Sequence, residues 1–220
     1  MSDLVTYSAE DGVAMLAMDD GKANAFSLDM TTALSAALDQ AEKDARVAVI
    51  MGRPGMFCAG FDLNVIRGDD AEAQARMRVS GFALLKRLYL HPQPVVIACT
   101  GHALAAGVLL LLTGDLRIGV AGAFKIGLNE VGIGLTLPSI GVELARDRLS
   151  PQVLSSAIIG AQIFDPEGAR AAGYLDETVS EDAFAGHVAA KARGLLELDA
   201  TAFAETKRIM RQATIDRMAE

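Results

Sequence analysis

Tryptophan is absent from this sequence and aromatic residues are few, with three tyrosines and eight phenylalanines in 220 residues. Cysteine is scarce as well: Cys58 and Cys99 lie in separate apolar runs and have no C-x-x-C spacing. A disulfide framework and a cysteine-based metal site are therefore disfavoured, and we expect both thiols to be reduced and buried. The three histidines show no ligand spacing, so no metal site is predicted.

Basic residues are outnumbered by acidic ones, 20 to 28, which gives a formal net charge of −8. Because nucleic-acid binding requires a basic surface, nucleic acid is not expected as a partner. The longest apolar run, residues 103–112, is ten residues long and therefore too short to span a bilayer. The first residues also lack the basic segment and the long apolar stretch of a signal peptide. We therefore expect a cytoplasmic protein with no membrane partner.

The sequence patterns of several common enzyme classes are also missing. The chain contains neither of the glycine-rich nucleotide loops, G-x-G-x-x-G and G-x-x-x-x-G-K-[ST]. It has no G-x-S-x-G elbow, which disfavours a serine hydrolase.

Hydrophobic patterning predicts an α/β fold with parallel strand pairing. Short apolar runs, typical of strands buried in a parallel sheet, alternate with amphipathic stretches over the first part of the chain. The predicted strands cover residues 13–18, 47–51, 95–99 and 115–120. One predicted helix begins after Ser27, and two others cover residues 70–90 and 104–113.

Beyond about residue 139 the patterning predicts helices only. Ser150-Pro151 and Asp165-Pro166 each combine an N-cap residue with a proline at the first helical position, and Gly173 is a candidate C-cap. Amphipathic helices are predicted at residues 181–198 and 200–219. We therefore expect a core, residues 1–150, and a C-terminal helical region, residues 151–220.

Two segments of small residues, 56–63 and 101–108, each follow a predicted buried strand. Small side chains let a ligand approach the main chain, and amides at the start of a helix are unpaired donors that favour negative charge. Two such amides converging on one oxygen would form an oxyanion hole. Spacing alone does not establish convergence, and tight packing at two turns explains these small residues equally well.

Together with their neighbours, the two segments resemble the crotonase (enoyl-CoA hydratase/isomerase) superfamily. Residues 57–63, FCAGFDL, resemble its F-x-A-G-x-D-[IL] motif, and residues 101–107 resemble its G-x-A-x-G-G-G motif in altered form. Residues 22–27, 94–98 and 127–131 resemble three further motifs of the family. Each motif alone is weak, but the combination is specific. The resemblance implies a crotonase-like ββα spiral core with a C-terminal helical region that forms a trimer.

The resemblance also implies catalytic roles on an acyl-CoA substrate. The amides of Phe61 and Ala106 would donate to the thioester oxygen, and Glu130 would be the acid/base. The family's second catalytic glutamate falls at Leu109, whose side chain cannot hold a water molecule. This departure favours double-bond isomerisation, which needs one base, over hydration. An enoyl-CoA hydratase proper and a non-catalytic acyl-CoA-binding subunit remain as alternatives.

Other polar residues near these motifs receive structural interpretations. Glu143 and Asp147 could replace the missing carboxylate, but we expect both on a solvated helix face. His102 is interpreted as a packed or hydrogen-bonded histidine at a turn. Asp62 is expected to cap the helix that follows the first motif.

In the family, the coenzyme A portion of the substrate meets the first motif, an early loop and a lysine of a C-terminal helix. By resemblance, the contact residues expected here are Lys22, Ala23, Ala59, Gly60, Asp62, Leu63 and Lys207. Solvated surface lysines remain an alternative for Lys22 and Lys207. Coenzyme A is part of the substrate, so no separate cofactor is expected. Family subunits associate as trimers or pairs of trimers, and we expect a homotrimer or a dimer of trimers here.

Overall fold

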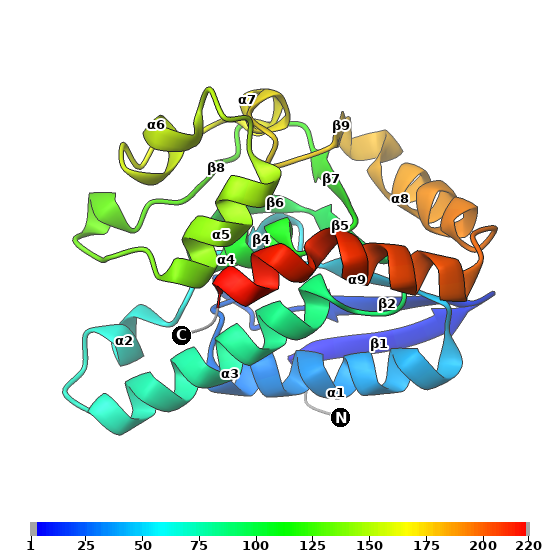
Figure 1. The fold of residues 1–220 in the computed structure, drawn as a ribbon, viewed down its shortest axis with the longest axis horizontal. Coiled ribbons are helices and arrows are strands. Elements are labelled where there is room, and N and C mark those ends of the chain that lie inside the picture. Colours follow the sequence, from blue (N-terminus) through cyan, green and yellow to red (C-terminus); the bar gives the residue numbers. More distant parts are fainter. Residues whose placement is uncertain (1–3, 219–220) are drawn as a thin grey trace.

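Two β-sheets of unequal size lie at the centre of the fold in the computed structural model, which describes residues 4–218 (Figure 1). The larger sheet has six strands in the order β1-β2-β3-β5-β7-β9. β1 and β2 pair antiparallel, whereas the other neighbours pair in parallel. The strands of this sheet are β1 (Val5–Glu10), β2 (Val13–Met18), β3 (Val47–Met51), β5 (Val95–Cys99), β7 (Leu116–Val120) and β9 (Glu177–Val179).

The smaller sheet has three short parallel strands in the order β4-β6-β8. They are β4 (Gly55–Cys58), β6 (Gly101–Leu104) and β8 (Ile126–Gly127). The first two run very close together, since a β-carbon on Gly101 would lie 2.1 Å from the carbonyl carbon of Gly55. Only glycine therefore fits at position 101.

Helices cover both sheets and are bounded by the expected caps in most places. They are α1 (Leu28–Asp44), α2 (Leu63–Ile66), α3 (Ala71–Tyr89), α4 (Ala106–Leu112), α5 (Ser139–Arg148), α6 (Leu154–Ile158), α7 (Pro166–Ala172), α8 (Glu181–Leu195) and α9 (Ala200–Arg217), with a 3-10 turn, η1 (Val131–Ile133). Ser27 accepts a hydrogen bond from the amide of Met30, and Asp165 caps α7 as predicted. Gly173 ends α7 in the left-handed conformation that glycine tolerates. Ser150 does not cap a helix, because α6 begins only at Leu154.

The central strands of the larger sheet, β3 and β5, are buried on both faces, and their side chains alternate between the two. Val47 and Val49 of β3 pack with α8, whereas Ala48 and Ile50 face the main core. That core also holds the buried faces of α1 and α4 and the strands of the smaller sheet. Its largest buried side chains are mainly aliphatic, with a few aromatic rings among them.

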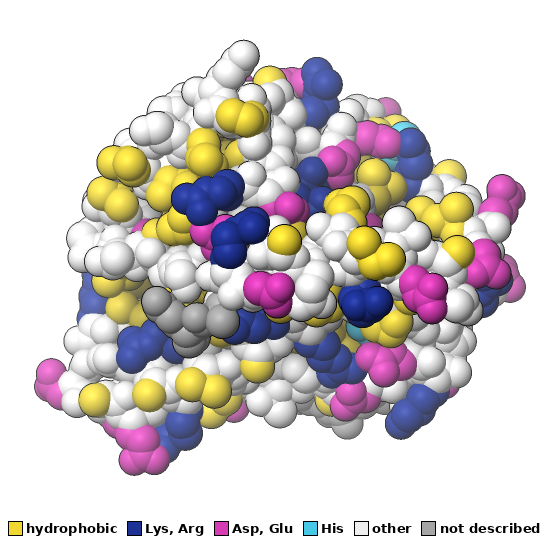
Figure 2. Space-filling view, in the orientation of Figure 1, with side chains coloured by type: hydrophobic (Ala, Val, Ile, Leu, Met, Phe, Trp, Pro, Cys, Tyr) yellow, Lys and Arg dark blue, Asp and Glu magenta, His cyan; other side chains and the backbone are white. Residues whose placement is uncertain are grey.

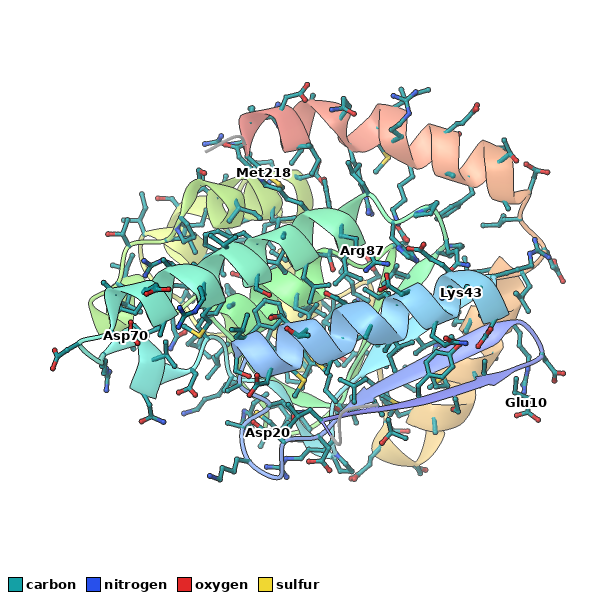
Figure 3. All side chains as sticks on the ribbon, turned by 90° about the horizontal axis from the view of Figure 1, so that it is seen from below. Glu10, Asp20, Lys43, Asp70, Arg87 and Met218 are labelled. Atoms are coloured by element: carbon teal, nitrogen blue, oxygen red, sulfur yellow. The ribbon has the colours of Figure 1, made fainter. Side chains whose placement is uncertain are left out.

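Charged side chains join the outer helices. Figure 3 shows α1 and α3 side by side, with Arg87 near the end of α3. The guanidinium of Arg87 pairs with Asp39 at 2.7 Å and Glu42 at 2.8 Å, both on α1. On the face that α9 crosses, acidic and basic side chains are interspersed (Figure 2). The described residues therefore form no broad basic surface on this face.

The α/β fold with parallel pairing is confirmed, but five strands, β1, β4, β6, β8 and β9, escaped prediction. β1 has only Val5 buried, so it lacks a clear alternating pattern. β4 and β6 were expected to be a loop and a turn, and each has only four residues, one of them glycine. The expectation of helices only beyond residue 139 is wrong, because β9 pairs with β7. The boundary near residue 150 stays a prediction.

Candidate active site

The three strands of the smaller sheet end next to one another, and each is followed by a segment with an expected role. β4 leads to Phe61, β6 leads to Ala106 at the start of α4, and β8 leads to Glu130. Since adjacent parallel strands have their carboxyl ends at the same edge, the fold gathers these three residues in one region. They are 24 or more positions apart in sequence, so the sheet is what unites them.

The first two segments meet main chain to main chain. Gly60 has a φ of +100°, and a β-carbon there would lie 3.2 Å from the amide nitrogen of Ala106 and 3.1 Å from the carbonyl oxygen of Leu104. Gly107 is equally confined, since its β-carbon would lie 2.1 Å from the carbonyl oxygen of Cys58. The two glycines allow the backbone that carries Phe61 to approach the first turn of α4.

The amides of Phe61 and Ala106 are free to bind a ligand. Within residues 4–218, neither amide has a hydrogen-bond acceptor. Ala105 precedes α4 without a side-chain cap, and within residues 4–218 the amides of Ala106 and Gly107, the first two of the helix, have no acceptor. Two unpaired donors near one another are suited to stabilising negative charge on a ligand oxygen.

Glu130 is a buried carboxylate held at the start of η1. Its carbonyl oxygen accepts hydrogen bonds from the amides of Ile133 and Leu135 at 3.0 and 2.9 Å, which fix the backbone. The residue is 7% exposed, and Oε2 has no hydrogen-bond partner within residues 4–218. Burial raises the pKa of Glu130 above its usual range, while its own backbone amide opposes the shift. The shift brings the pKa of this carboxylate closer to the working pH, which favours a role in proton transfer.

A cavity of about 580 Å³ connects these groups. Its walls are mostly apolar and come from four places: the first motif, α3, the start of α4 and the segment after β8. The lining residues are Ala59, Phe61, Leu63, Ile66, Gln74, Arg78, Phe82, Leu104, Ala105, Ala106, Leu109, Asn129, Glu130, Ile133, Leu135, Thr136 and Pro138. Glu130 is the one carboxylate among them, and the buried Leu109 presents an aliphatic wall.

The early loop between β2 and α1 is tied to the first motif. The buried side chain of Asn24 donates through Nδ2 to the carbonyl oxygens of Met18 at 3.0 Å and Phe57 at 3.2 Å. Burial would raise the pKa of Asp20, but hydrogen bonds from the amides of Ala25, Asn24 and Lys22 lower it overall. Asp20 therefore acts as a permanent anion that organises the turn (Figure 3).

Main-chain hydrogen bonds then place this loop beside the motif. The amide of Ala59 donates to the carbonyl of Ala23 at 3.0 Å, and the amide of Phe26 donates to the carbonyl of Gly60 at 2.7 Å. The Lys22 side chain lies on the exposed side, while its carbonyl accepts a 2.8 Å hydrogen bond from Arg53 Nε. The early loop and the first motif, two of the segments expected to contact coenzyme A, are therefore adjacent.

The match to one protein family settles the relationship. The family model described as enoyl-CoA hydratase/isomerase matches residues 8–220. The chain belongs to this family. Enoyl-CoA delta isomerase 1 of rat mitochondria is 30% identical over 223 residues, which cover 98% of this chain and 76% of the relative. A probable enoyl-CoA hydratase of Mycobacterium avium is 31% identical over 205 residues, covering 91% of this chain and 78% of the relative.

Solved structures agree with the family assignment. An enoyl-CoA hydratase/isomerase family protein of Pseudomonas syringae is 46% identical and superposes with a TM-score of 0.95. The comparison covers 98% of this chain and 94% of that one. The predicted crotonase fold is therefore confirmed. This member is an enzyme-family protein whose relatives are named both isomerase and hydratase, so the family alone does not choose between the two reactions.

Two predicted positions in this family member differ from expectation. Lys207 was expected either to meet a ribose phosphate or to be a solvated surface lysine, but it is 6% exposed and its Nζ lies 2.6 Å from Oδ2 of Asp115. A phosphate would have to compete with Asp115 for this buried ammonium, so the ion pair gives no support to a contact between Lys207 and coenzyme A. Glu143 was expected to be solvated, yet it is buried and paired with Arg146 and Arg217.

The structure also tests the predictions made for Asp62, His102, the two cysteines and Asp147. Asp62 accepts a 2.8 Å hydrogen bond from the amide of Asn64 and so caps α2, beside the exposed Leu63. His102 Nδ1 accepts from the amide of Lys125 at 2.9 Å, which confirms its structural interpretation. Both cysteines are free and buried, as predicted. The Asp147 side chain was expected on a solvated face, but it is only 21% exposed and accepts hydrogen bonds from the hydroxyls of Tyr89 and Thr214.

Sequence reasoning missed the contribution of α3 to the cavity. Gln74, Arg78 and Phe82 lie on one face of this helix and line the cavity. The rings of Phe26, Phe61 and Phe82 form a chain, with centroid separations of 5.6 and 5.9 Å. The i, i+4, i+8 spacing of these α3 residues was the available signal, but nothing in the pattern indicated which partner they face.

Metal ions and membranes can be considered from the described part of the chain. Within residues 4–218, no group of three or more histidine, cysteine, aspartate and glutamate side chains is arranged to hold a metal ion. Over the same residues, none of the helices combines the length and apolar character needed to cross a bilayer.

Proposed function

We propose that this family member is an enoyl-CoA isomerase, which moves a double bond from position 3 to position 2 of an acyl-CoA thioester. The observation that carries the proposal is one cavity lined by Phe61, Ala106 and Glu130, in which Glu130 is the only carboxylate contributed by residues 4–218. Isomerisation needs one group that removes a proton and returns it, whereas hydration also needs a group that positions water.

In the proposed reaction, Glu130 removes a proton from carbon 2 of the 3-enoyl thioester. The electron pair moves onto the thioester oxygen, where the amides of Phe61 and Ala106 would stabilise the enolate. The same carboxyl then returns the proton to carbon 4, and the double bond settles between carbons 2 and 3. The raised pKa of Glu130 supports both steps, because an upward shift makes the carboxylate a stronger base and keeps its protonated form available as the acid.

The character of the cavity wall supports the choice of isomerisation over hydration. Leu109 is 1% exposed and lines the cavity where the resemblance would place a second glutamate. Glu143 does not line the cavity and is engaged by Arg217, with Nε 2.7 Å from Oε2, so it does not replace the missing group. A mainly apolar wall also suits a hydrocarbon chain and disfavours a bound nucleophilic water.

The surface formed by residues 22–25 and 59–63 is proposed to receive the coenzyme A portion of the substrate. Its main-chain groups are held by the hydrogen bonds between Ala59 and Ala23 and between Phe26 and Gly60. Coenzyme A enters and leaves as part of the substrate, and the proposed reaction requires no separate cofactor. A trimeric assembly and a cytoplasmic location also stay predictions, with exposed Ile209 and Met210 on α9 as candidate contact residues.

The proposal is tested by giving the pure protein a 3-enoyl-CoA and, separately, a 2-enoyl-CoA. Isomerisation creates a conjugated thioester and therefore raises its ultraviolet absorbance, whereas hydration of the 2-enoyl substrate lowers it. We expect the first reaction to be much faster than the second. Fast hydration without migration of the double bond would identify a hydratase instead. If both reactions are absent but calorimetry shows coenzyme A thioester binding, the chain is a non-catalytic binding subunit.

A further inference from the structure

Tyr174 lies against the segment that carries Glu130. It follows the C-cap of α7, is fully buried, and packs its ring on Phe164 with a centroid separation of 5.7 Å. Phe164 exchanges two main-chain hydrogen bonds of 2.9 Å with Ile126 in β8. Four residues after Ile126, the chain reaches Glu130. Tyr174 does not line the cavity, so its hydroxyl lies behind the cavity wall.

Three buried polar atoms in this region have no hydrogen-bond partner within residues 4–218. They are Oδ1 of Asn129, Oε2 of Glu130 and the hydroxyl of Tyr174. The amide of Leu128 is near the phenol oxygen but is not in hydrogen-bonding geometry with it. Buried polar atoms are almost always paired, with protein or with bound water. The Tyr174 hydroxyl can donate one hydrogen bond, and Oδ1 and Oε2 can each accept one.

The pKa of Tyr174 indicates that its hydroxyl lies near the Glu130 carboxylate. Burial raises the pKa of the Tyr174 phenol, and the charge of Glu130 raises it further. The phenol therefore remains protonated and available as a donor throughout the neutral range. No charged side chain within residues 4–218 shifts the pKa of Glu130. The exposed Arg78 on the cavity wall therefore leaves this pKa unchanged as well.

We propose that Tyr174 is a positioning residue for Glu130, whose buried Oε2 receives a hydrogen bond from the Tyr174 hydroxyl through one bound water molecule. Oε1 is then left to face the substrate. A donor to Oε2 stabilises the ionised carboxylate and therefore lowers its pKa relative to a site without the hydroxyl. The inference rests on the proposed function, since it assigns Tyr174 to the support of the proposed acid/base.

The experiment compares the wild type with Tyr174→Phe, which removes only the hydroxyl. Protein with carbon-13-labelled glutamate is titrated by NMR, and the Glu130 signal is assigned by its loss in Glu130→Gln. Tyr89→Phe is the matched control, because Tyr89 is also buried but its hydroxyl bonds to Asp147 and does not face the cavity.

We expect Tyr174→Phe to raise the pKa of Glu130 by about one unit, the shift expected on losing a hydrogen bond to a charged group. Tyr89→Phe should leave it unchanged. In the isomerase assay, the acidic limb of the pH profile of kcat/KM should move upwards by the same amount in Tyr174→Phe alone. A Glu130 titration identical in wild type and Tyr174→Phe would overturn the proposal.

This design separates the positioning role from the reaction itself. The titration needs no turnover, so it decides the role of Tyr174 even if no enoyl-CoA is isomerised. Absence of isomerisation by the wild type would count against the proposed function only. Thermal unfolding of both variants shows whether either substitution disturbs the fold, and loss of one water-mediated hydrogen bond should change the Tm only slightly. An unshifted Glu130 in a fully folded Tyr174→Phe would show that the tyrosine merely fills space.

Discussion

A β-carbon on Gly60 would lie 2.9 Å from the β-carbon of Ala105. The two residues belong to the two segments that carry the proposed amide donors, Phe61 and Ala106. Gly60 also has a positive φ of +100°, a conformation that residues with a side chain rarely adopt. Close approach of the segments and the geometry of the proposed oxyanion hole therefore depend on the same missing side chain.

Gly60→Ala should consequently lose both stability and activity. The strained φ alone costs about 1–3 kcal/mol, and the new methyl group must also push the two segments apart. Since each kcal/mol changes Tm by about 2–4 °C for a chain of this length, a clear drop is expected in calorimetry. The rate of isomerisation should fall further than the stability loss explains, because the two amides would no longer converge.

Gly55→Ala provides the control for this change. Gly55 also has a positive φ, +81°, but a β-carbon there would meet no atom within 4 Å. It should show the conformational cost and keep its rate. Equal rate losses in the two variants would argue against a special contact between the segments.

Glu130→Gln should trade activity for stability. Removing the acid/base should slow isomerisation by about 10²–10⁴-fold, whereas coenzyme A thioesters should still bind. Burial raises the folded-state pKa of Glu130 above its unfolded value, so the folded wild type binds more protons than the unfolded chain between the two values. Its stability is therefore complete below the unfolded pKa and declines as the pH rises through the folded pKa.

The variant has no carboxylate to desolvate and should escape this decline. Its Tm should match that of the wild type below the unfolded pKa of Glu130, exceed it increasingly as the pH rises toward the folded pKa, and stay higher by a constant amount above that pKa. Thermal unfolding across the pH range is the measurement. A Glu130→Gln variant less stable than the wild type at pH 8 would mean that the carboxylate has a favourable partner in the fold.

Local sequence signals predicted those parts of the fold that depend on local physics. The strands at Val47–Met51 and Val95–Cys99 are continuous apolar runs, and they were predicted with the observed boundaries because burial on both faces leaves an unmistakable pattern. Caps such as Asp62 and Gly173 were also predicted, since a cap depends on a few neighbouring residues. By contrast, β9 is short, half-buried and defined only by its pairing with β7.

The candidate site was harder to predict from physics alone. The resemblance pointed to Phe61, Ala106 and Glu130, but their convergence depends on the order of β4, β6 and β8 in a sheet that had not been predicted. Lys207 is an example of a buried position that local sequence does not indicate. A lysine in an amphipathic helix is normally solvated, and the sequence around it gives no sign that Asp115, 92 positions away, would draw it inside.

Ala105→Gly should stabilise the protein. Ala105 has φ +48° and ψ −125°, a region suited to glycine, so its side chain costs about 1–3 kcal/mol. The greater freedom of the unfolded chain with glycine offsets about 0.4–1 kcal/mol of this gain. The net result should be a modest rise in Tm. Ala106→Gly is the neighbouring control: Ala106 begins a helix without positive φ, and glycine there should lower Tm or leave it unchanged.

The buried charges that attach α9 should respond unequally to mutation. Asp115 lies between Lys207 Nζ, at 2.6 Å, and Arg211 Nη2, at 2.9 Å, and it also accepts a 2.8 Å hydrogen bond from the amide of Val95. Burial lowers the pKa of Lys207 to about 8, although Asp115 opposes the shift. The ammonium is therefore costly to bury, and the carboxylate is what makes its position tolerable.

Asp115→Asn should destabilise the protein by about 3–5 kcal/mol, because it leaves two cations buried without their partner. Lys207→Met should cost much less, since Asp115 keeps Arg211 and the methionine side chain fills the space of the lysine stem. Chemical denaturation of both variants is the measurement. The double variant should lose less stability than the sum of the two single losses, and its stability should be closer to that of Lys207→Met than this sum predicts. If the two single variants lose equal stability, Lys207 contributes as much as Asp115 and the asymmetry inferred from burial is wrong.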